Sequence, residues 1–308
     1  MRVIFLGTPA FAVGVLDNIM RSSHEVVCVV TQPDRACGRG KKVNFCPVKQ
    51  FALDHGLTVR QYEKINDNVE ELVGFNADIM VTCAYGQILK QPVLDVCKHG
   101  IINVHASLLP AYRGSSPVEW ALINGEKEIG VTIMQTELGV DTGDMILQRS
   151  IALSGEENAE EALEKLSGLG AELIVEALDL IEKGEAKFVK QDESKATKCK
   201  MFTKEDGKID FSLPAEKVKS FIRGVNPRPG AFFCGENGRI KVLRARVVSF
   251  LGGDRAGEIV AADPKKGLVI RCGEGYLELT EIQGENARPM SSADYLRGKR
   301  LTVGSVID

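Results

Sequence analysis

GIINVHASLLP, residues 100–110, is the stretch that decides the fold. Its apolar beginning is typical of a buried strand, and Pro110 marks the region where the strand has ended. Residues two apart on a strand point to the same face, so Asn103 and His105 are expected to project together. Both lie near the carboxyl end of the strand, which is the edge where open α/β sheets bind ligands. The stretch therefore predicts a sheet with a ligand site at this edge.

Strand-like and helix-like segments alternate on both sides of this stretch. Short apolar runs at 3–6, 26–30, 79–83 and 131–134 are separated by segments with helical periodicity. Such alternation is typical of βαβ units, so we predict a Rossmann-like, mostly parallel sheet with helices on both faces. The turn after the first strand, GTP at 7–9, lacks the spacing G-x-G-x-x-G. A nicotinamide cofactor is therefore not indicated.

The chain is long enough for two domains. Apolar residues recur at helical spacing over 160–182, which predicts one long amphipathic helix, and a polar, charged stretch follows. Beyond it come one helix and regularly spaced short strands with glycine-rich turns, the pattern of a small antiparallel barrel. We predict a catalytic domain over 1–188, a linker over 189–207 and an OB-like β-barrel domain over 208–308.

The composition is that of an ordinary globular protein. The chain has 308 residues, of which 44% are hydrophobic and 26% charged. Its first apolar run is too short for a signal peptide, and no apolar stretch approaches the roughly 20 residues of a membrane helix. We expect a soluble, cytoplasmic monomer without a membrane partner.

The eight cysteines form no Cys-x-x-Cys pair and have no histidine at zinc-ligand spacing. Metal binding is therefore not expected, and the predicted site contains no metal. Most of the cysteines lie in apolar runs, where a reduced cysteine behaves as a small core residue. A reducing compartment fits this usage.

The charges are distributed unevenly, although the net charge is only −3. Residues 151–185 carry ten acidic and two basic side chains, whereas 186–246 carry fifteen basic and seven acidic ones. The excess of basic residues over 186–246 suits the binding of a polyanion to one face of the protein. The alternative is an ordinary solvated surface with chance clustering.

Three residues combine an amide, an imidazole and a carboxylate. Asn103 and His105 share the strand, and Asp141 lies in GVDTG at 139–143. In acyl or formyl transfer an amide stabilises the oxyanion of a tetrahedral intermediate, while another group moves protons. Taken singly, such a histidine is typical of a hydrogen-bonded structural residue, and an aspartate before Thr-Gly is typical of a turn.

A resemblance that extends beyond these three residues favours the catalytic interpretation. The chain resembles the folate-dependent formyltransferases, and most closely those that act on methionyl-tRNA. The matching segments run through the chain: FLGTP at 5–9, TQPDR at 31–35, GRGKK at 38–42, AYG at 84–86, NVHASLLP at 103–110, and GVTIM at 130–134 leading to DTGD at 141–144.

The resemblance implies transfer of a formyl group from 10-formyltetrahydrofolate to the amino group of methionine on initiator tRNA, which serves translation initiation. It assigns the catalytic roles to Asn103, His105 and Asp141. The residues expected to contact the folate are Ser107, Leu108, Leu109 and Pro110, together with a pocket wall of Tyr85, Gly86, Ile88 and Leu89. This second segment could equally be a simple strand end with a glycine turn.

The same resemblance gives a function to a basic, glycine-containing loop. Arg39, Lys41 and Lys42 follow the second strand, so they are expected at the same sheet edge as the site. There they would hold the acceptor end of the tRNA. A generic basic loop is common, and the motif alone is unspecific.

Three other functions share parts of this pattern. A formyltransferase that acts on a small amine, such as glycinamide ribonucleotide or a nucleotide sugar, would share the site but does not predict the basic loop and the barrel. A formyltetrahydrofolate hydrolase would need no contact with tRNA. A non-catalytic RNA-binding protein would have no reason to keep Asn103, His105 and Asp141 intact.

Overall fold

The chain forms two compact units in a computed structural model that describes residues 1–37, 42–235 and 238–307. Unit 1 consists of Met1–Gly114, Glu128–Ile151 and Leu163–Cys199, and unit 2 contains the rest of the chain. Both units are therefore built from segments that are distant in sequence. The domain boundaries at 188 and 208 stay predictions.

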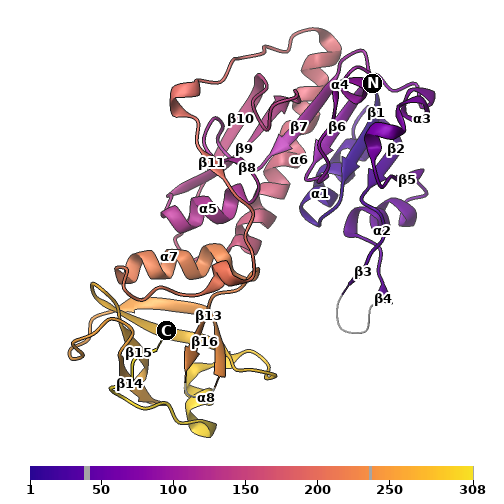
Figure 1. Cartoon of the computed structure of the whole chain (residues 1–308). Helices are drawn as coiled ribbons and strands as arrows, with labels where there is room; N and C mark the ends of the chain where they lie inside the picture. The colour runs from indigo at the N-terminus through magenta and orange to yellow at the C-terminus, as the bar shows by residue number, and fades with distance from the viewer. Residues whose placement is uncertain (38–41, 236–237, 308) are drawn as a thin grey trace. The chain divides into compact units, whose positions relative to one another are not determined.

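Unit 1 contains a seven-stranded sheet in the order β10-β9-β7-β6-β1-β2-β5 (Figure 1). The strands are β1 (Arg2–Gly7), β2 (Glu25–Thr31), β5 (Val59–Gln61), β6 (Ile79–Cys83), β7 (Ile101–His105), β9 (Glu128–Gln135) and β10 (Met145–Ala152). Strands β5, β2, β1, β6 and β7 are parallel, and β9 pairs antiparallel with β7. The predicted mostly parallel sheet is confirmed.

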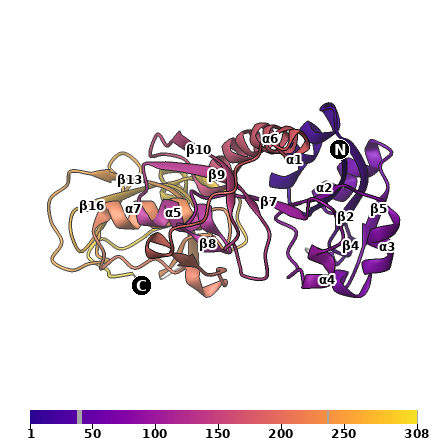
Figure 2. The same ribbon diagram turned by 90° about the horizontal axis from the view of Figure 1, so that it is seen from above.

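Three helices cover one face of this sheet: α1 (Phe11–Arg21), α2 (Pro47–Asp54) and the long α6 (Ala159–Lys183). Helix α1 buries Ala12, Val15, Leu16 and Ile19, which share one helical face. Figure 2 shows α1 and α6 side by side, and Ser167 Oγ of α6 donates a hydrogen bond to Phe11 O at 2.8 Å. The amphipathic helix predicted over 160–182 is α6.

The other face of the sheet is covered by the helices α3 (Val69–Gly74) and α4 (Gln91–Leu94) and the 3-10 turn η1 (Ile65–Asp67). A buried core lies between them and the strands: Ile4, Leu6, Cys28, Val30, Tyr62, Ile65, Leu72, Met80, Tyr85, Leu89, Val93, Cys97 and Ile101. All five residues of β6 are buried, as expected for a central strand covered on both faces.

Short elements complete unit 1 beside the sheet. Strands β3 (Ala36–Cys37) and β4 (Lys42–Val43) pair antiparallel, and β8 (Arg113–Gly114) pairs parallel with β11 (Lys198–Cys199). The second pair joins the loop after β7 to the polar segment after α6. A 3-10 turn, η2, precedes β11 at Glu193–Lys195.

Unit 2 is an antiparallel sheet that packs against helices. Its elements are α5 (Pro117–Asn124), η3 (Glu205–Gly207), α7 (Ala215–Val225), β12 (Phe232–Gly235), β13 (Gly238–Val248), β14 (Ile259–Asp263), β15 (Gly267–Arg271), β16 (Tyr276–Gln283), β17 (Met290–Ser291) and α8 (Ser292–Gly298). The strand order is β12-β13-β16-β15-β14, and β17 pairs with β16. The sheet curls around a buried core, which confirms the predicted antiparallel, OB-like second domain (Figure 1).

Helices α5 and α7 approach closely in unit 2. At Gly224 of α7 an added Cβ would lie 2.5 Å from Ile123 Cγ1 and 2.6 Å from Glu119 O, both in α5. Only glycine therefore fits at this contact.

None of the helices in the described part of the chain is long and apolar enough to span a membrane.

Candidate active site

Strand β7 brings Asn103 and His105 to the carboxyl edge of the parallel strands. Asn103 lies opposite Thr82 of β6, and His105 lies opposite Thr132 of β9. His105 is buried and Asn103 is half-buried. Pairing with both neighbouring strands therefore fixes the register of β7 at these two positions.

The amide of Asn103 is oriented by Thr82. The Thr82 hydroxyl donates a hydrogen bond of 2.8 Å to Asn103 Oδ1, whereas its alternative acceptor, Ile102 O, is 3.4 Å away. With its oxygen toward Thr82, the Asn103 amide points its nitrogen the other way, as a donor. This is the group that a developing oxyanion requires.

His105 is held by a backbone carbonyl. Its Nε2 lies 3.0 Å from Tyr112 O, and because a carbonyl can only accept, Nε2 must carry a proton. In neutral His105 the unprotonated nitrogen is therefore Nδ1. This atom faces Asp141 Oδ2 at 3.7 Å, which is too far for a hydrogen bond and is within range of an ion pair only when Nδ1 also carries a proton.

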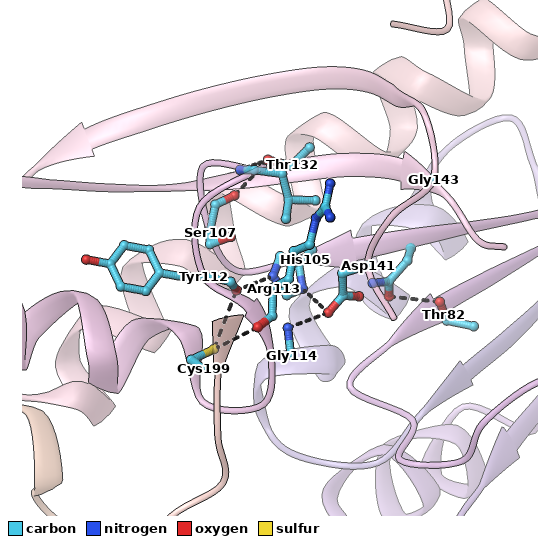
Figure 3. Close-up of polar contacts among 12 residues, drawn as sticks. Thr82, His105, Ser107, Tyr112, Arg113, Gly114, Thr132, Asp141, Gly143 and Cys199 are labelled. Carbon is cyan, nitrogen blue, oxygen red and sulfur yellow. Dashed lines mark hydrogen bonds and ion pairs between the residues drawn. The ribbon is translucent and has the colours of Figure 1, made fainter. Parts of the chain in front are cut away.

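Asp141 lies in the loop between β9 and β10, and its carboxylate is anchored by the backbone. Asp141 Oδ2 accepts a hydrogen bond of 2.8 Å from Gly114 N, and the side chain is 17% exposed. Figure 3 shows His105, Asp141 and Gly114 converging from three segments of unit 1. The structure thus brings His105 and Asp141 together, and Asn103 lies two positions before His105 on the same strand.

The SLLP segment follows His105 directly and is fixed by β9 and β10. Thr132 Oγ1 donates to Ser107 O at 2.7 Å and accepts from Leu109 N at 3.2 Å. Gln148 Nε2 donates to Leu109 O at 3.0 Å. Leu108 packs against Gly130, where an added Cβ would collide with the leucine side chain. The peptide bond between Leu109 and Pro110 is cis.

The segment of Tyr85, Gly86, Ile88 and Leu89 follows β6, the neighbour of β7, and so lies at the same sheet edge. Tyr85 O accepts hydrogen bonds from Thr8 Oγ1 and Gln32 Nε2. Tyr85 and Leu89 are buried, whereas Ile88 is 74% exposed. The apolar side chain of Ile88 is therefore open to solvent, and the contacts of this segment with folate stay a prediction.

The predicted tRNA-contacting residues lie at or beyond the edge of the described chain. Arg39 and Lys41 are outside the described residues, and Lys42 begins β4. Their role stays a prediction from the sequence.

The structure adds residues to the site that the sequence did not suggest. Thr82 had a detectable signal, because it lies at the end of the strand that precedes the one with Asn103. The buried Gln191, in the polar segment after α6, had none. Arg113 Nε donates to Gln191 Oε1 at 2.9 Å, although 78 positions separate the two residues.

Comparison with known proteins agrees with this geometry. Residues 1–178 match the family model described as formyl transferase, and 201–300 match that of the formyl transferase C-terminal domain. Methionyl-tRNA formyltransferase of Caldanaerobacter subterraneus is 42% identical, and the aligned region covers 100% of both chains. That of Agathobacter rectalis is 44% identical over 99% of each chain.

The chain belongs to the methionyl-tRNA formyltransferase family.

Solved structures share the fold of this family at lower identity. HypX from Aquifex aeolicus, in complex with tetrahydrofolic acid, has a TM-score of 0.67 at 18% identity, covering 96% of this chain and 47% of HypX. The N-formyltransferase from Helicobacter canadensis, in complex with folinic acid and dTDP-3-aminofucose, also has a TM-score of 0.67, at 17% identity, covering 90% of this chain and 98% of its own. These two likenesses support the fold, whereas family membership rests on the full-length relatives.

Proposed function

We propose that the protein transfers the formyl group of 10-formyltetrahydrofolate to the α-amino group of methionyl-initiator tRNA. The observation that carries the proposal is that Asn103 and His105 lie two positions apart at the end of β7 and that Asp141 faces His105, in a chain that matches methionyl-tRNA formyltransferases from end to end. The products are formylmethionyl-tRNA, used in translation initiation, and tetrahydrofolate. The protein acts in the cytoplasm as a monomer.

The first chemical step is attack of the neutral amine on the formyl carbon. A new carbon–nitrogen bond forms, and the carbonyl oxygen becomes negative. Asn103 Nδ2 is the donor for this oxyanion, since Thr82 occupies the amide oxygen. Loss of one such donor typically raises the barrier by about 3 kcal/mol.

The second step breaks the bond between the formyl carbon and the folate nitrogen. The attacking amine loses a proton, and the departing nitrogen gains one. Asp141 accepts the proton of the amine, directly or through a water molecule. His105 Nδ1, which faces Asp141, relays a proton toward the leaving nitrogen.

The substrates approach from the same sheet edge. Backbone groups of SLLP and of the segment after β6 pair with the flat pterin ring. Arg39, Lys41 and Lys42 hold the acceptor end of the tRNA, and cations of unit 2 contact its phosphates.

The test is to measure formyl transfer to charged initiator tRNA, uncharged tRNA and small amines in parallel. We expect transfer only to the charged tRNA, with release of tetrahydrofolate. Preferential transfer to a sugar amine or to glycinamide ribonucleotide would instead identify a small-amine formyltransferase. Release of formate without any acceptor would identify a hydrolase.

A further inference from the structure

Two side chains of segment 189–199 hold the backbone that carries the candidate catalytic groups. We propose that Gln191 and Thr197 are positioning residues for the formyl transfer reaction, Gln191 for Asp141 and Thr197 for His105. The inference rests on the proposed function and adds to it the residues that set the geometry of proton transfer.

Two non-glycine residues of the site adopt left-handed backbone conformations. Asp141 has φ of +53°, and Tyr112, whose carbonyl accepts from His105, has φ of +61°. Residues other than glycine rarely adopt a positive φ, because their Cβ is crowded by the backbone. The surrounding structure must therefore hold Asp141 and Tyr112 in this conformation. In both cases a holding contact comes from segment 189–199.

Gln191 holds the loop of Asp141 through two backbone carbonyls. Its Nε2 donates to Asp141 O at 2.9 Å and to Gly143 O at 2.8 Å. Its Oε1 accepts from Arg113 at 2.9 Å (Nε) and 2.8 Å (Nη2). A flipped amide would set its oxygen against two carbonyls and its nitrogen against a cation, so only one orientation is compatible with these partners.

Arg113 anchors Gln191 in turn. The guanidinium is buried and forms a bidentate ion pair with Glu193, with distances of 3.0 and 2.7 Å. It holds the pKa of the Glu193 carboxyl below its usual value. A buried guanidinium with two hydrogen bonds to one carboxylate is a rigid support, because loss of these partners would leave an unpaired charge in a buried position.

Thr197 holds the loop that carries Tyr112. Its Oγ1 accepts from Tyr112 N at 2.8 Å, and its carbonyl accepts from Arg113 N at 2.9 Å. Tyr112 O in turn accepts a hydrogen bond from His105 Nε2, which leaves Nδ1 as the nitrogen that faces Asp141 (Figure 3). Thr197 therefore acts on His105 through a single intervening residue.

Both contacts bear on the separation of His105 and Asp141. This distance is already 3.7 Å, so a small displacement of either loop breaks the alignment needed for proton transfer. Displacement by about 1 Å can lower the rate of an enzyme by on the order of 100-fold. Positioning residues should therefore affect kcat, whereas residues that bind substrate affect KM.

The first experiment uses Gln191→Met, which keeps the length of the side chain and removes its polar atoms. We expect kcat to fall about 10- to 100-fold, while KM for the folate and for the tRNA changes less than about threefold. The pH profile of kcat should also shift, because Asp141 and His105 change their mutual distance. Lys195→Ala is the matched control: it lies in the same segment, its side chain is 74% exposed and it pairs with Asp192.

The second experiment uses Thr197, an exposed residue whose replacement leaves the core intact. Thr197→Val removes the hydroxyl acceptor at nearly constant shape, and we expect kcat to fall roughly 10-fold. Thr197→Ser keeps the hydroxyl and should restore the parental rate and pH profile. A purely structural role would move the melting temperature and leave the pH profile unchanged.

The outcomes separate this inference from the proposed function. If the parent protein does not formylate methionyl-tRNA, the proposed function fails, whatever the variants do. If the parent is active and Thr197→Val retains kcat and pH profile, the positioning role of Thr197 is wrong. If a folded Gln191→Met variant retains the parental kcat and pH profile, the positioning role of Gln191 is wrong. If Gln191→Met does not fold, the Gln191→Glu variant takes its place. It keeps the acceptor for Arg113 and loses both hydrogen bonds to the carbonyls of Asp141 and Gly143. A parental kcat and pH profile of this variant would overturn the positioning role of Gln191.

Discussion

At the scale of single residues, each candidate catalytic side chain is oriented by one identifiable partner. Thr82 orients Asn103, Tyr112 O orients His105, and Gly114 N orients Asp141. The spacing of Asn103 and His105 could be predicted, because side chains alternate along a strand. Thr82 could also have been suspected, because it lies at the end of the neighbouring strand. Tyr112 O and Gly114 N could not, since they are backbone groups of an irregular loop, whose hydrogen bonds leave no periodic signal in the sequence.

Replacing Asp141 by asparagine tests its role as a base. In the Asp141→Asn variant the amide side chain keeps the volume and can still accept from Gly114 N, and asparagine tolerates a positive φ well. We therefore expect an unchanged melting temperature and a loss of kcat of about 100-fold or more, because the amide cannot accept the proton. Turnover within a few-fold of the parent would remove Asp141 from the mechanism.

Replacing Thr82 tests the orientation of the Asn103 amide. Thr82→Val deletes the hydroxyl at similar volume and leaves Asn103 Oδ1 without this donor. An amide free to turn presents its nitrogen to the oxyanion for only part of the time, so we expect kcat to fall about 10-fold. Thr82→Ser should recover most of the rate. Equal kinetics of the valine and serine variants would show that the hydroxyl does not orient Asn103.

At the scale of elements, the regular parts follow from the sequence and the irregular parts do not. Helix α6 and strand β13 were predictable from their periodicity, whereas the edge strand β10 was not, because none of its residues is fully buried and its polar residues interrupt the apolar run. Segment 189–199 has the composition of a linker. It nevertheless belongs to unit 1, because its polar side chains bond to the loops around Tyr112 and Asp141.

Strand β7 carries two groups that should act as a unit. We expect Asn103→Ala and His105→Ala each to lower kcat strongly and to change KM for the folate little. Both groups stabilise the same transition state, so the loss of the second group raises the barrier less when the first is already missing. The double variant should therefore lose less than the product of the two single effects. Measurement of kcat for the parent, the two single variants and the double variant gives the coupling energy between Asn103 and His105. If the two losses simply multiply, the groups act independently and the prediction is wrong.

At the scale of the whole molecule, stability should depend on pH through a buried histidine of unit 1. Burial, together with the nearby amine of Met1, lowers the pKa of His24 below 6.5, while Asp179 and Glu182 act in the opposite direction. The unfolded chain therefore takes up a proton on His24 at a higher pH than the folded chain. The contribution of neutral His24 to the free energy of unfolding is therefore fully present above about pH 6.5 and is lost as the pH falls below this value.

Melting curves measured from pH 7.5 to about pH 5 test this dependence. His24→Gln should flatten the decline at acidic pH, whereas His55→Gln is a matched control, because His55 is exposed. Parallel declines of the parent and His24→Gln would show that other groups determine the acid sensitivity.

We expect tRNA binding to depend on where the basic side chains lie along the chain, and not on the net charge. The net charge is only −3, yet residues 186–246 carry fifteen basic and seven acidic side chains. A polyanion should therefore bind to local basic surfaces, and each phosphate contact should steepen the salt dependence of binding by nearly one unit. Arg39 has the greatest expected effect in the basic loop, because a guanidinium makes bidentate contacts that lysine cannot reproduce.

We expect Arg39→Ala to weaken binding of initiator tRNA, to lower the salt slope by about one unit and to leave folate affinity unchanged. Arg21→Ala is the control, because Arg21 ends α1 near the amino ends of the parallel strands, opposite the candidate site, and its side chain is 75% exposed. Titrations of both variants across a salt series measure affinity and slope together. If Arg39→Ala keeps the parental affinity and slope, the basic loop does not contact the tRNA, and recognition must rest on the cations of unit 2.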